Sequence, residues 1–173
     1  LAHWLSIGGV TSRGLAPPSS VDDLIEAART ITAMDKVHRS LPACPQMHGT
    51  GMWIGTMVAL NCGGTVVTQR TSHLDADALI QCVIDNQVTD LTIVGDAFAR
   101  PILAALDTAA NAGAPYDLSH VGQIASSGVM WSSEIKEGLL RHHDMILNDI
   151  MGSTEGSMGG SISTRDGAAK TAK

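Results

Sequence analysis

The segment 149–156 combines two glycines, two hydroxyl groups and two carboxylates in a way that suits phosphate and metal chemistry. Gly152 lets the backbone approach a ligand closely or adopt a positive φ. The hydroxyl of Thr154 could donate to a phosphate oxygen, and Glu155 is a hard oxygen ligand of the kind that Mg²⁺ takes while it bridges phosphates. A surface turn capped by Thr154 and Glu155 would use the same residues, so these residues alone leave both interpretations open.

A second candidate lies in the segment 45–53, where His48 is followed by three small residues. Small residues at this point suggest that the backbone packs closely against a ligand or a neighbouring strand. A lone histidine such as His48 could belong to a ligand site or be a structural histidine. Trp53 could line an apolar tunnel or be a core residue on a helix.

Two further turns carry polar residues directly after apolar runs. Ser126, Ser127 and Gly128 follow one run, with Val129 next to them. The other run, 91–95, ends at a glycine that precedes Asp96.

Other chemistry receives less support from the sequence. His142, His143 and Asp144 are adjacent, but neighbouring residues on a helix point in different directions, so a solvated helix end is preferred to a metal site. The sequence contains no Gly-x-Ser-x-Gly elbow of a serine hydrolase and no Gly-x-Gly-x-x-Gly dinucleotide fingerprint.

Alternating strand and helix patterns must position these groups. The expected strands lie around 66–67, over 91–95, over 121–128 and from Met145 into a loop at 152–156. The expected helices are one capped by Ser20, one over 75–86, one that contains 101–106 with Pro101 in its first turn, and one capped by Ser132. Residues 156–160 are expected to be a small, flexible tail. Repeated strand–helix–strand units predict an α/β fold with a mostly parallel sheet flanked by helices. In such sheets ligands bind at the carboxyl ends of the strands, where three of these turns would lie.

Composition narrows the partners and the setting. The chain of 173 residues has a net charge of −6 and no basic run, which argues against nucleic acid or an anionic membrane surface as the main partner. Cys44, Cys62 and Cys82 show neither zinc spacing nor a disulfide framework, so a reducing, cytoplasmic setting is expected. No signal peptide or transmembrane run is seen.

The expected division is an irregular lead-in over 1–20, a partial α/β domain over 21–160 and a truncated tail over 161–173, and both ends fit a segment cut from a longer polypeptide.

Together these motifs resemble the adenylate-forming, AMP-binding superfamily, which includes acyl-CoA synthetases, luciferases and peptide-synthetase adenylation domains. The segment 152–155 resembles the signature Tyr-Gly-x-Thr-Glu, with Met151 in the place of the Tyr. The segment 45–48 resembles the Pro-Leu-x-His loop, 124–129 resembles the Gly-Gly-Ala-Pro turn, and 89–106 resembles one wall of the acyl site. The four matches occur in family order over about 41–160, and they look most like actinobacterial fatty-acyl and steroid side-chain CoA ligases.

The resemblance implies an acid–thiol ligase. A carboxylate attacks the α-phosphate of ATP to give an acyl-adenylate and pyrophosphate, and the thiol of CoA then displaces AMP. It implies catalytic roles for His48, Thr154 and Glu155, with Glu155 holding Mg²⁺. The residues implied to bind nucleotide are Ser126, Ser127, Gly128, Asp149, Met151, Gly152, Ser153 and Thr154. The residues implied to border the acyl chain are His48, Trp53, Asp96 and Val129.

The resemblance also implies that this chain is part of a large N-terminal domain. The family's phosphate loop ending in Pro-Lys-Gly, its ribose-binding Asp and its C-terminal catalytic Lys have no counterpart in the sequence. The chain alone is therefore expected to have little or no ligase activity and to retain weak nucleotide or acyl affinity. A fatty or other bulky hydrophobic acid is the expected substrate, with room left by Gly49, Gly51 and Gly95, and unpaired edges are expected to favour self-association. The alternative is a non-catalytic α/β module that binds a nucleotide or an acyl group.

Overall fold

The computed structural model describes residues 20–23, 25, 38–71, 73–153 and 156–167. Its centre is a six-stranded sheet with the order β2-β1-β3-β4-β5-β6. The strands are β1 (Arg39–Pro42), β2 (Thr65–Val66), β3 (Asp90–Ile93), β4 (Gln123–Ser127), β5 (Ile146–Ser153) and β6 (Gly156–Ser163). The first five strands pair in parallel, and β6 pairs antiparallel with β5. The predicted α/β class with a mostly parallel sheet is confirmed.

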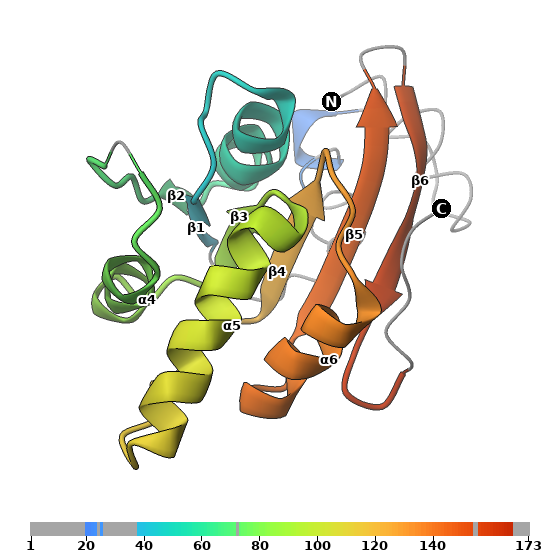
Figure 1. The fold of residues 1–173 in the computed structure, drawn as a ribbon. Coiled ribbons are helices and arrows are strands. Elements are labelled where there is room, and N and C mark those ends of the chain that lie inside the picture. The colour runs from blue at the N-terminus through green and yellow to red at the C-terminus, as the bar shows by residue number, and fades with distance from the viewer. Residues whose placement is uncertain (1–19, 24, 26–37, 72, 154–155, 168–173) are drawn as a thin grey trace.

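Helices connect the parallel strands. They are the π-helix η3 (Thr50–Met57), followed directly by α3 (Val58–Asn61), and the α-helices α4 (Ala76–Asp85), α5 (Gly95–Asn111) and α6 (Ser133–His142). The helices α4, α5 and α6 lie over one face of the sheet (Figure 1). From β1 the chain passes through η3 and α3 to β2 at one edge of the sheet. It then crosses the sheet in the opposite direction, from β2 to β5, with α4, α5 and α6 as the connections.

The helix η3 packs on the opposite face of the sheet. Leu91 of β3 lies among residues of α4 and α5. The next residue, Thr92, must point the other way, because side chains alternate along a strand. A Cβ atom at Gly55 of η3 would lie 3.2 Å from Cβ of Thr92 and 2.7 Å from Cβ of Pro42, so η3 contacts the face opposite α5. Helices therefore flank both faces, as predicted.

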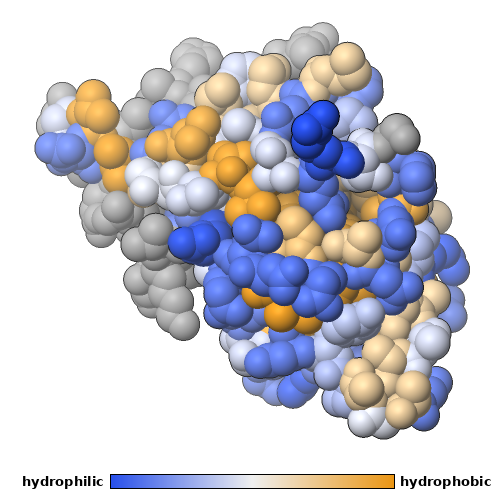
Figure 2. Space-filling view, turned by 90° about the vertical axis from the view of Figure 1, so that its left-hand side faces the viewer, coloured by the Kyte–Doolittle hydropathy of each residue, from blue (hydrophilic) through white to orange (hydrophobic). Residues whose placement is uncertain are grey.

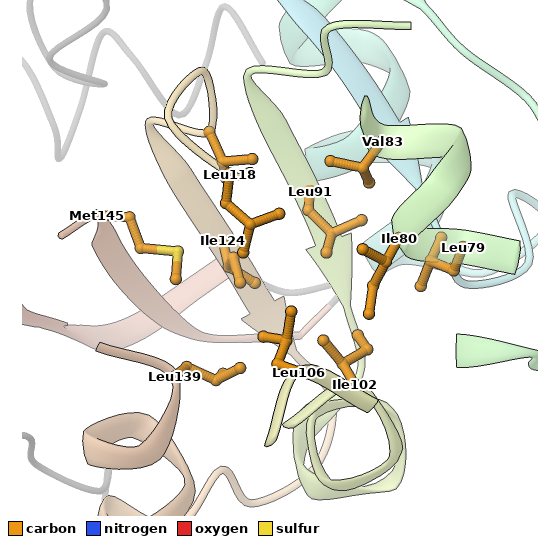
Figure 3. A pocket seen from close by; sticks show the side chains of 11 residues that line it. Leu79, Ile80, Val83, Leu91, Ile102, Leu106, Leu118, Ile124, Leu139 and Met145 are labelled. Atoms are coloured by element: carbon orange, nitrogen blue, oxygen red, sulfur yellow. The ribbon is translucent and has the colours of Figure 1, made fainter. Parts of the chain in front are cut away.

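The core between the sheet and α4, α5 and α6 is aliphatic. Figure 3 shows side chains of the three helices pointing toward those of β3 and β4 around a small cavity of about 20 Å³. Its lining is apolar throughout, from Leu79, Ile80, Val83, Leu91, Ile102, Leu106, Leu118, Val121, Ile124, Leu139 and Met145. A dry void of this size is a packing imperfection of the core and not a ligand site.

Local signals in the sequence account for several elements. The side chain of Ser20 accepts a hydrogen bond from the backbone N–H of Asp23 at 3.0 Å, and the carboxylate of Asp23 accepts one from the backbone N–H of Ser20 at 3.1 Å, which confirms the predicted helix cap. Asp75 caps α4 by accepting from the N–H of Ala78. The predicted helix that follows Ser132 is confirmed as α6, with Leu139 buried on its inner face, but the expected side-chain cap is wrong, because the hydroxyl of Ser132 donates to Asp96.

Two expectations about elements were wrong. The helix expected to begin at Pro101 begins at Gly95, so Pro101 lies inside α5 and not in its first turn. The segment expected to be a loop at 152–156 followed by a flexible tail over 156–160 consists, where it is described, of strand residues: 152 and 153 end β5, and 156–160 form most of β6. The partner strand β5 supplies the hydrogen bonds that this Gly- and Ser-rich segment needs to become a strand. Because β6 continues to Ser163, it crosses the expected boundary at residue 160, and the domain division stays a prediction.

Candidate functional site

The loops expected to bind a nucleotide follow two neighbouring parallel strands. In the β4–β5 pair, Ser126 is opposite Asp149 and Ser127 is opposite Ile150. The turn that begins at Gly128 and the segment 151–153 therefore leave the same edge of the sheet side by side. This is the carboxyl edge, where ligands bind in α/β sheets of this kind.

The loop after β4 also meets the loops after β1 and β3. Gly128 adopts a φ of +98°, a conformation that favours glycine. A Cβ atom placed on Gly128 would lie 3.6 Å from Val94, directly after β3, and 3.7 Å from the hydroxyl oxygen of Thr50, the first residue of η3. The structure thus brings together three of the segments that the sequence singled out.

The residues expected to border an acyl chain lie along this edge. His48 is exposed in the loop after β1, while Trp53 of η3 and Val129 after β4 are 51% and 52% exposed. Met47 and Met130, which flank His48 and Val129 in the sequence, are also exposed apolar side chains. Singly exposed apolar side chains are common on protein surfaces, so the role of these residues toward an acyl chain stays a prediction.

Asp96 has well-defined protein partners at the start of α5. Its Oδ1 accepts hydrogen bonds from the backbone N–H and the hydroxyl of Ser132, and its Oδ2 pairs with Arg100 at 3.0 Å. Burial raises the pKa of Asp96, but the hydrogen bonds from Ser132 and the Arg100 guanidinium outweigh it and hold the pKa below its ordinary value. The carboxylate therefore joins α5 to the start of α6, and its role toward an acyl chain stays a prediction.

The space beside two of the small residues is filled by the chain itself. A Cβ atom on Gly51 would lie 2.5 Å from the carbonyl oxygen of Pro45, and one on Gly95 would lie 2.5 Å from that of Met130. Gly95 also adopts a φ of +51°. These glycines permit close packing of the loops around the edge and leave no room for an acid at their own positions.

Two residues expected to contact nucleotide are buried and bonded inside the protein. The hydroxyl of Ser126 accepts a hydrogen bond from the backbone N–H of Gly95 at 2.8 Å. The carboxylate of Asp149 forms an ion pair with Lys136 of α6, with the Nζ and Oδ2 atoms 2.8 Å apart. Sequence reasoning missed Lys136, although its position one turn before Leu140 placed it on the apolar face of the helix.

The remaining predicted nucleotide residues lie at the end of β5. Met151 and Gly152 sit at a bulge in the pairing with β6, and Ser153 is the last residue of β5. A bulge bends a strand and redirects its side chains, and it is common next to binding sites. Thr154 and Glu155, the predicted catalytic and metal-binding residues, fall outside the described residues.

Other parts of the described chain offer no competing site. A hollow of about 320 Å³, lined by Gly122, Asp144, Met145, Ile146, Thr164 and Asp166, lies at the opposite, amino edge of β4 and β5. His142 pairs with Asp107 and His143 contacts the carbonyl oxygen of Val121, and among the described residues no three His, Cys, Asp or Glu side chains form a metal-binding group.

The surface on the β2 and α4 side is mixed in character. Figure 2 shows a band of hydrophobic residues there, interrupted by hydrophilic ones. Within the described part of the chain, no helix is both long and apolar enough to cross a membrane.

Comparison with known proteins matches the chain to one family. The family model described as "AMP-binding enzyme" matches residues 19–173. A medium/long-chain-fatty-acid–CoA/3-oxocholest-4-en-26-oate–CoA ligase of Mycolicibacterium smegmatis is 35% identical over 131 residues, which are 75% of this chain and 23% of the relative. A 3-oxocholest-4-en-26-oate–CoA ligase of Rhodococcus rhodochrous is 34% identical over 69% of this chain and 21% of its own length. The chain thus spans about a quarter of the length of these curated relatives.

Solved structures show the same fold. The o-succinylbenzoate CoA synthetase MenE of Bacillus subtilis superposes with a TM-score of 0.59 at 15% identity, over 79% of this chain and 27% of that structure. At this identity the likeness concerns the fold alone.

Proposed function

Since this chain belongs to the AMP-binding enzyme family, we propose that the protein of which it forms part is an ATP-dependent acyl-CoA synthetase. The observation that carries the proposal is the meeting of the loops after β1, β3 and β4 with the end of β5 at one edge of the sheet. The names of the relatives, which are CoA ligases, support the same reaction class.

The proposed reaction has two steps. A carboxylate oxygen of the acid attacks the α-phosphate of ATP, and pyrophosphate leaves. The thiol of CoA then attacks the acyl carbonyl, and AMP leaves. The first step builds negative charge at the α-phosphate, and preorganised donors that meet this charge lower the barrier.

The roles of the residues follow the family resemblance. The turn Ser126–Gly128 and the segment 151–153 frame the adenosine, and the hydroxyl of Thr154 donates to a phosphate oxygen. Asp149 contributes to the frame from within β5. Mg²⁺ would be held by Glu155 together with phosphate oxygens and water, a ligand set that Mg²⁺ commonly takes, and it would neutralise charge on the phosphates.

The acid is proposed to lie beside the exposed apolar side chains of the carboxyl edge. His48, Trp53 and Val129 would border its chain. Asp96 would hold the loop that carries Val129 in place, because Asp96 accepts a hydrogen bond from Ser132 in that loop. A fatty or other bulky hydrophobic acid fits this apolar edge and the named substrates of the relatives. The three described free cysteines support a reducing, cytoplasmic setting.

The test is ATP–pyrophosphate exchange by the full protein with medium-chain, long-chain and sterol-derived acids. Glu155→Gln is expected to lower the exchange rate about 100-fold, because a charged group that meets the phosphates is lost. The exposed Glu137 of α6 provides the control, and Glu137→Gln should leave the rate unchanged.

A non-catalytic module is the competing function. It predicts that the full protein binds ATP or an acid but catalyses no exchange with any of the acids. That outcome, with a folded protein, would overturn the ligase proposal.

A further inference from the structure

A buried ion pair lies beneath the proposed nucleotide site. Lys136 has no exposed side-chain surface, and the side chain of Asp149 is 7% exposed. The Nζ atom of Lys136 is 2.8 Å from Oδ2 of Asp149 and 5.3 Å from the ring centre of Trp131, which is itself fully buried. The ammonium group is therefore enclosed between a carboxylate and an aromatic face.

The pair joins two elements that meet at the carboxyl edge. Asp149 belongs to β5, two residues before Met151, where the bulge in β5 begins. Lys136 lies in the first half of α6, the helix that starts directly after the loop from β4. In the neighbouring strand Ser126, the register partner of Asp149, likewise holds the start of α5 through Gly95. At one level of the sheet, adjacent strands are thus each fixed to a helix.

Stability gives little reason to keep such a pair. Removing two charges from water is costly, and replacing a buried ion pair by apolar residues of similar volume is often neutral or stabilising. What a buried pair supplies is direction, because an ammonium and a carboxylate bond in a narrow range of geometries. Here the ion pair fixes the orientation of β5 relative to α6 just before the bulge in β5.

We propose that Lys136 and Asp149 are positioning residues that hold the end of β5 in the geometry required for ATP; this rests on the proposed function. Neither side chain touches substrate, because both are buried. Their effect passes through the backbone of Met151 and Gly152, which frames the adenosine. A displacement of about 1 Å in such a frame can weaken catalysis by about 100-fold.

The first test replaces both charges in the full protein with Lys136→Met and Asp149→Leu. Unfolding in urea should remain within error of the unaltered protein, because the pair is exchanged for apolar contacts. The KM for ATP is expected to rise at least about tenfold, while the KM for the acid stays the same, since only the nucleotide frame has moved. An unchanged free energy of unfolding together with a raised KM for ATP separates positioning from a purely structural role.

A matched control uses another side-chain contact between α6 and a neighbouring helix. His142 near the end of α6 pairs with Asp107 of α5 at 2.8 Å. The double variant His142→Gln/Asp107→Asn should leave both KM values unchanged. A second variant of the buried pair, Lys136→Gln/Asp149→Asn, keeps the shapes and removes the charges, in case the apolar variant does not fold.

The outcomes separate this inference from the proposed function. An unaltered protein that catalyses no exchange would refute the ligase function itself. An active protein whose folded double variant keeps the original KM for ATP would overturn the positioning role alone. If neither variant of the buried pair folds, the pair is a requirement of the fold and the positioning role is equally overturned.

Discussion

At the residue scale, Asp96 connects two loops of the carboxyl edge. Its two carboxylate oxygens are used by Ser132 and Arg100, and the side chain is mostly shielded from water. Because its pKa is lowered in the folded chain, the ionised form is favoured by folding. The stability that it supplies is complete above the pKa of an unfolded Asp, about 3.9, and is lost as the pH falls through the lower folded value.

Replacing Asp96 by Asn should therefore destabilise the chain at neutral pH and make it less sensitive to acid. We expect a loss of about 1–2 kcal/mol in the free energy of unfolding at pH 7, because charge-assisted hydrogen bonds are weakened. The difference from the unaltered chain should shrink as the pH is lowered below 4. Urea unfolding at several pH values measures it.

Asp144→Asn is the control for this change, since Asp144 is exposed after the end of α6. Its curve should follow that of the unaltered chain at every pH. A constant difference for Asp96→Asn across the whole pH range would contradict the assignment, because it would show that the charge of Asp96 is not what stabilises the loops.

Residue chemistry explains which site residues the sequence could reveal. The combination of polar residues and glycines indicated Ser126, Gly128 and Met151–Gly152 as site residues. The structure places them at the ends of two adjacent strands, β4 and β5. The bonds of Ser126 and Asp149 to Gly95 and Lys136 span 31 and 13 residues. Such pairings depend on how strands and helices align, and no local pattern contains that information.

At the element scale, the start of α5 depends on a glycine. Gly95 has a φ of +51°, and a Cβ atom there would lie 2.5 Å from the carbonyl oxygen of Met130 and 2.6 Å from the side chain of Val129. Gly95→Ala should lower the free energy of unfolding by about 2–3 kcal/mol, because strain in the backbone adds to a clash with the neighbouring loop. Thermal or urea unfolding is the measurement.

Gly63 separates these two contributions. It has a φ of +71°, but no atom lies within 4 Å of the position of a Cβ atom. Gly63→Ala should therefore cost only the backbone strain, about 1 kcal/mol. Equal losses for the two variants would show that the contact of Gly95 with the loop after β4 is unimportant.

Element prediction succeeded where periodicity was strong. The buried runs of β3 and β4 and the apolar faces of α4 and α6 were predicted from their sequences. The strand β6 has no such signal, because its glycines and serines favour no strand and its form comes from pairing with β5. The helix η3 was expected only as the helix on which Trp53 would lie, and its glycines pack closely against Pro45 and Pro42.

At the scale of the whole molecule, the sheet has two edges of different character. The edge strand β2 has only two residues, whereas β6 has eight and pairs with no described strand other than β5. A long edge strand is a template for pairing with another chain. Ile162 of β6 is an exposed apolar residue on this strand.

We expect the chain to self-associate through β6 in a concentration-dependent way. Light scattering after size-exclusion chromatography should show dimers or larger species, and Ile162→Lys should shift the population toward the monomer, since an edge lysine opposes pairing. Leu60 is an exposed apolar residue of α3, so Leu60→Lys serves as the control. A monomer at every concentration would contradict this expectation.

The last prediction concerns the catalytic capacity of the chain by itself. It carries the edge where the loops after β1, β3 and β4 meet, but it spans only about a quarter of its curated relatives. Its sequence contains no Ser/Thr/Gly-rich loop ending in Pro-Lys-Gly, so the chain lacks the phosphate donors that the family resemblance assigns to this loop. Removing a single such donor can cost about 10²–10³ in rate.

The isolated chain should therefore form acyl-adenylate at least about 10³-fold more slowly than a full-length relative, while ATP binds weakly. Pyrophosphate exchange measures the first quantity and calorimetric titration with ATP the second, with the Mycolicibacterium smegmatis ligase as the reference for both. Weak ATP binding that is further reduced by Ser127→Trp, which fills the frame at the end of β4, would locate the binding at the carboxyl edge. Adenylate formation near the rate of the full-length relative would instead mean that the described edge suffices for phosphate chemistry, and the dependence on a separate phosphate loop would be wrong.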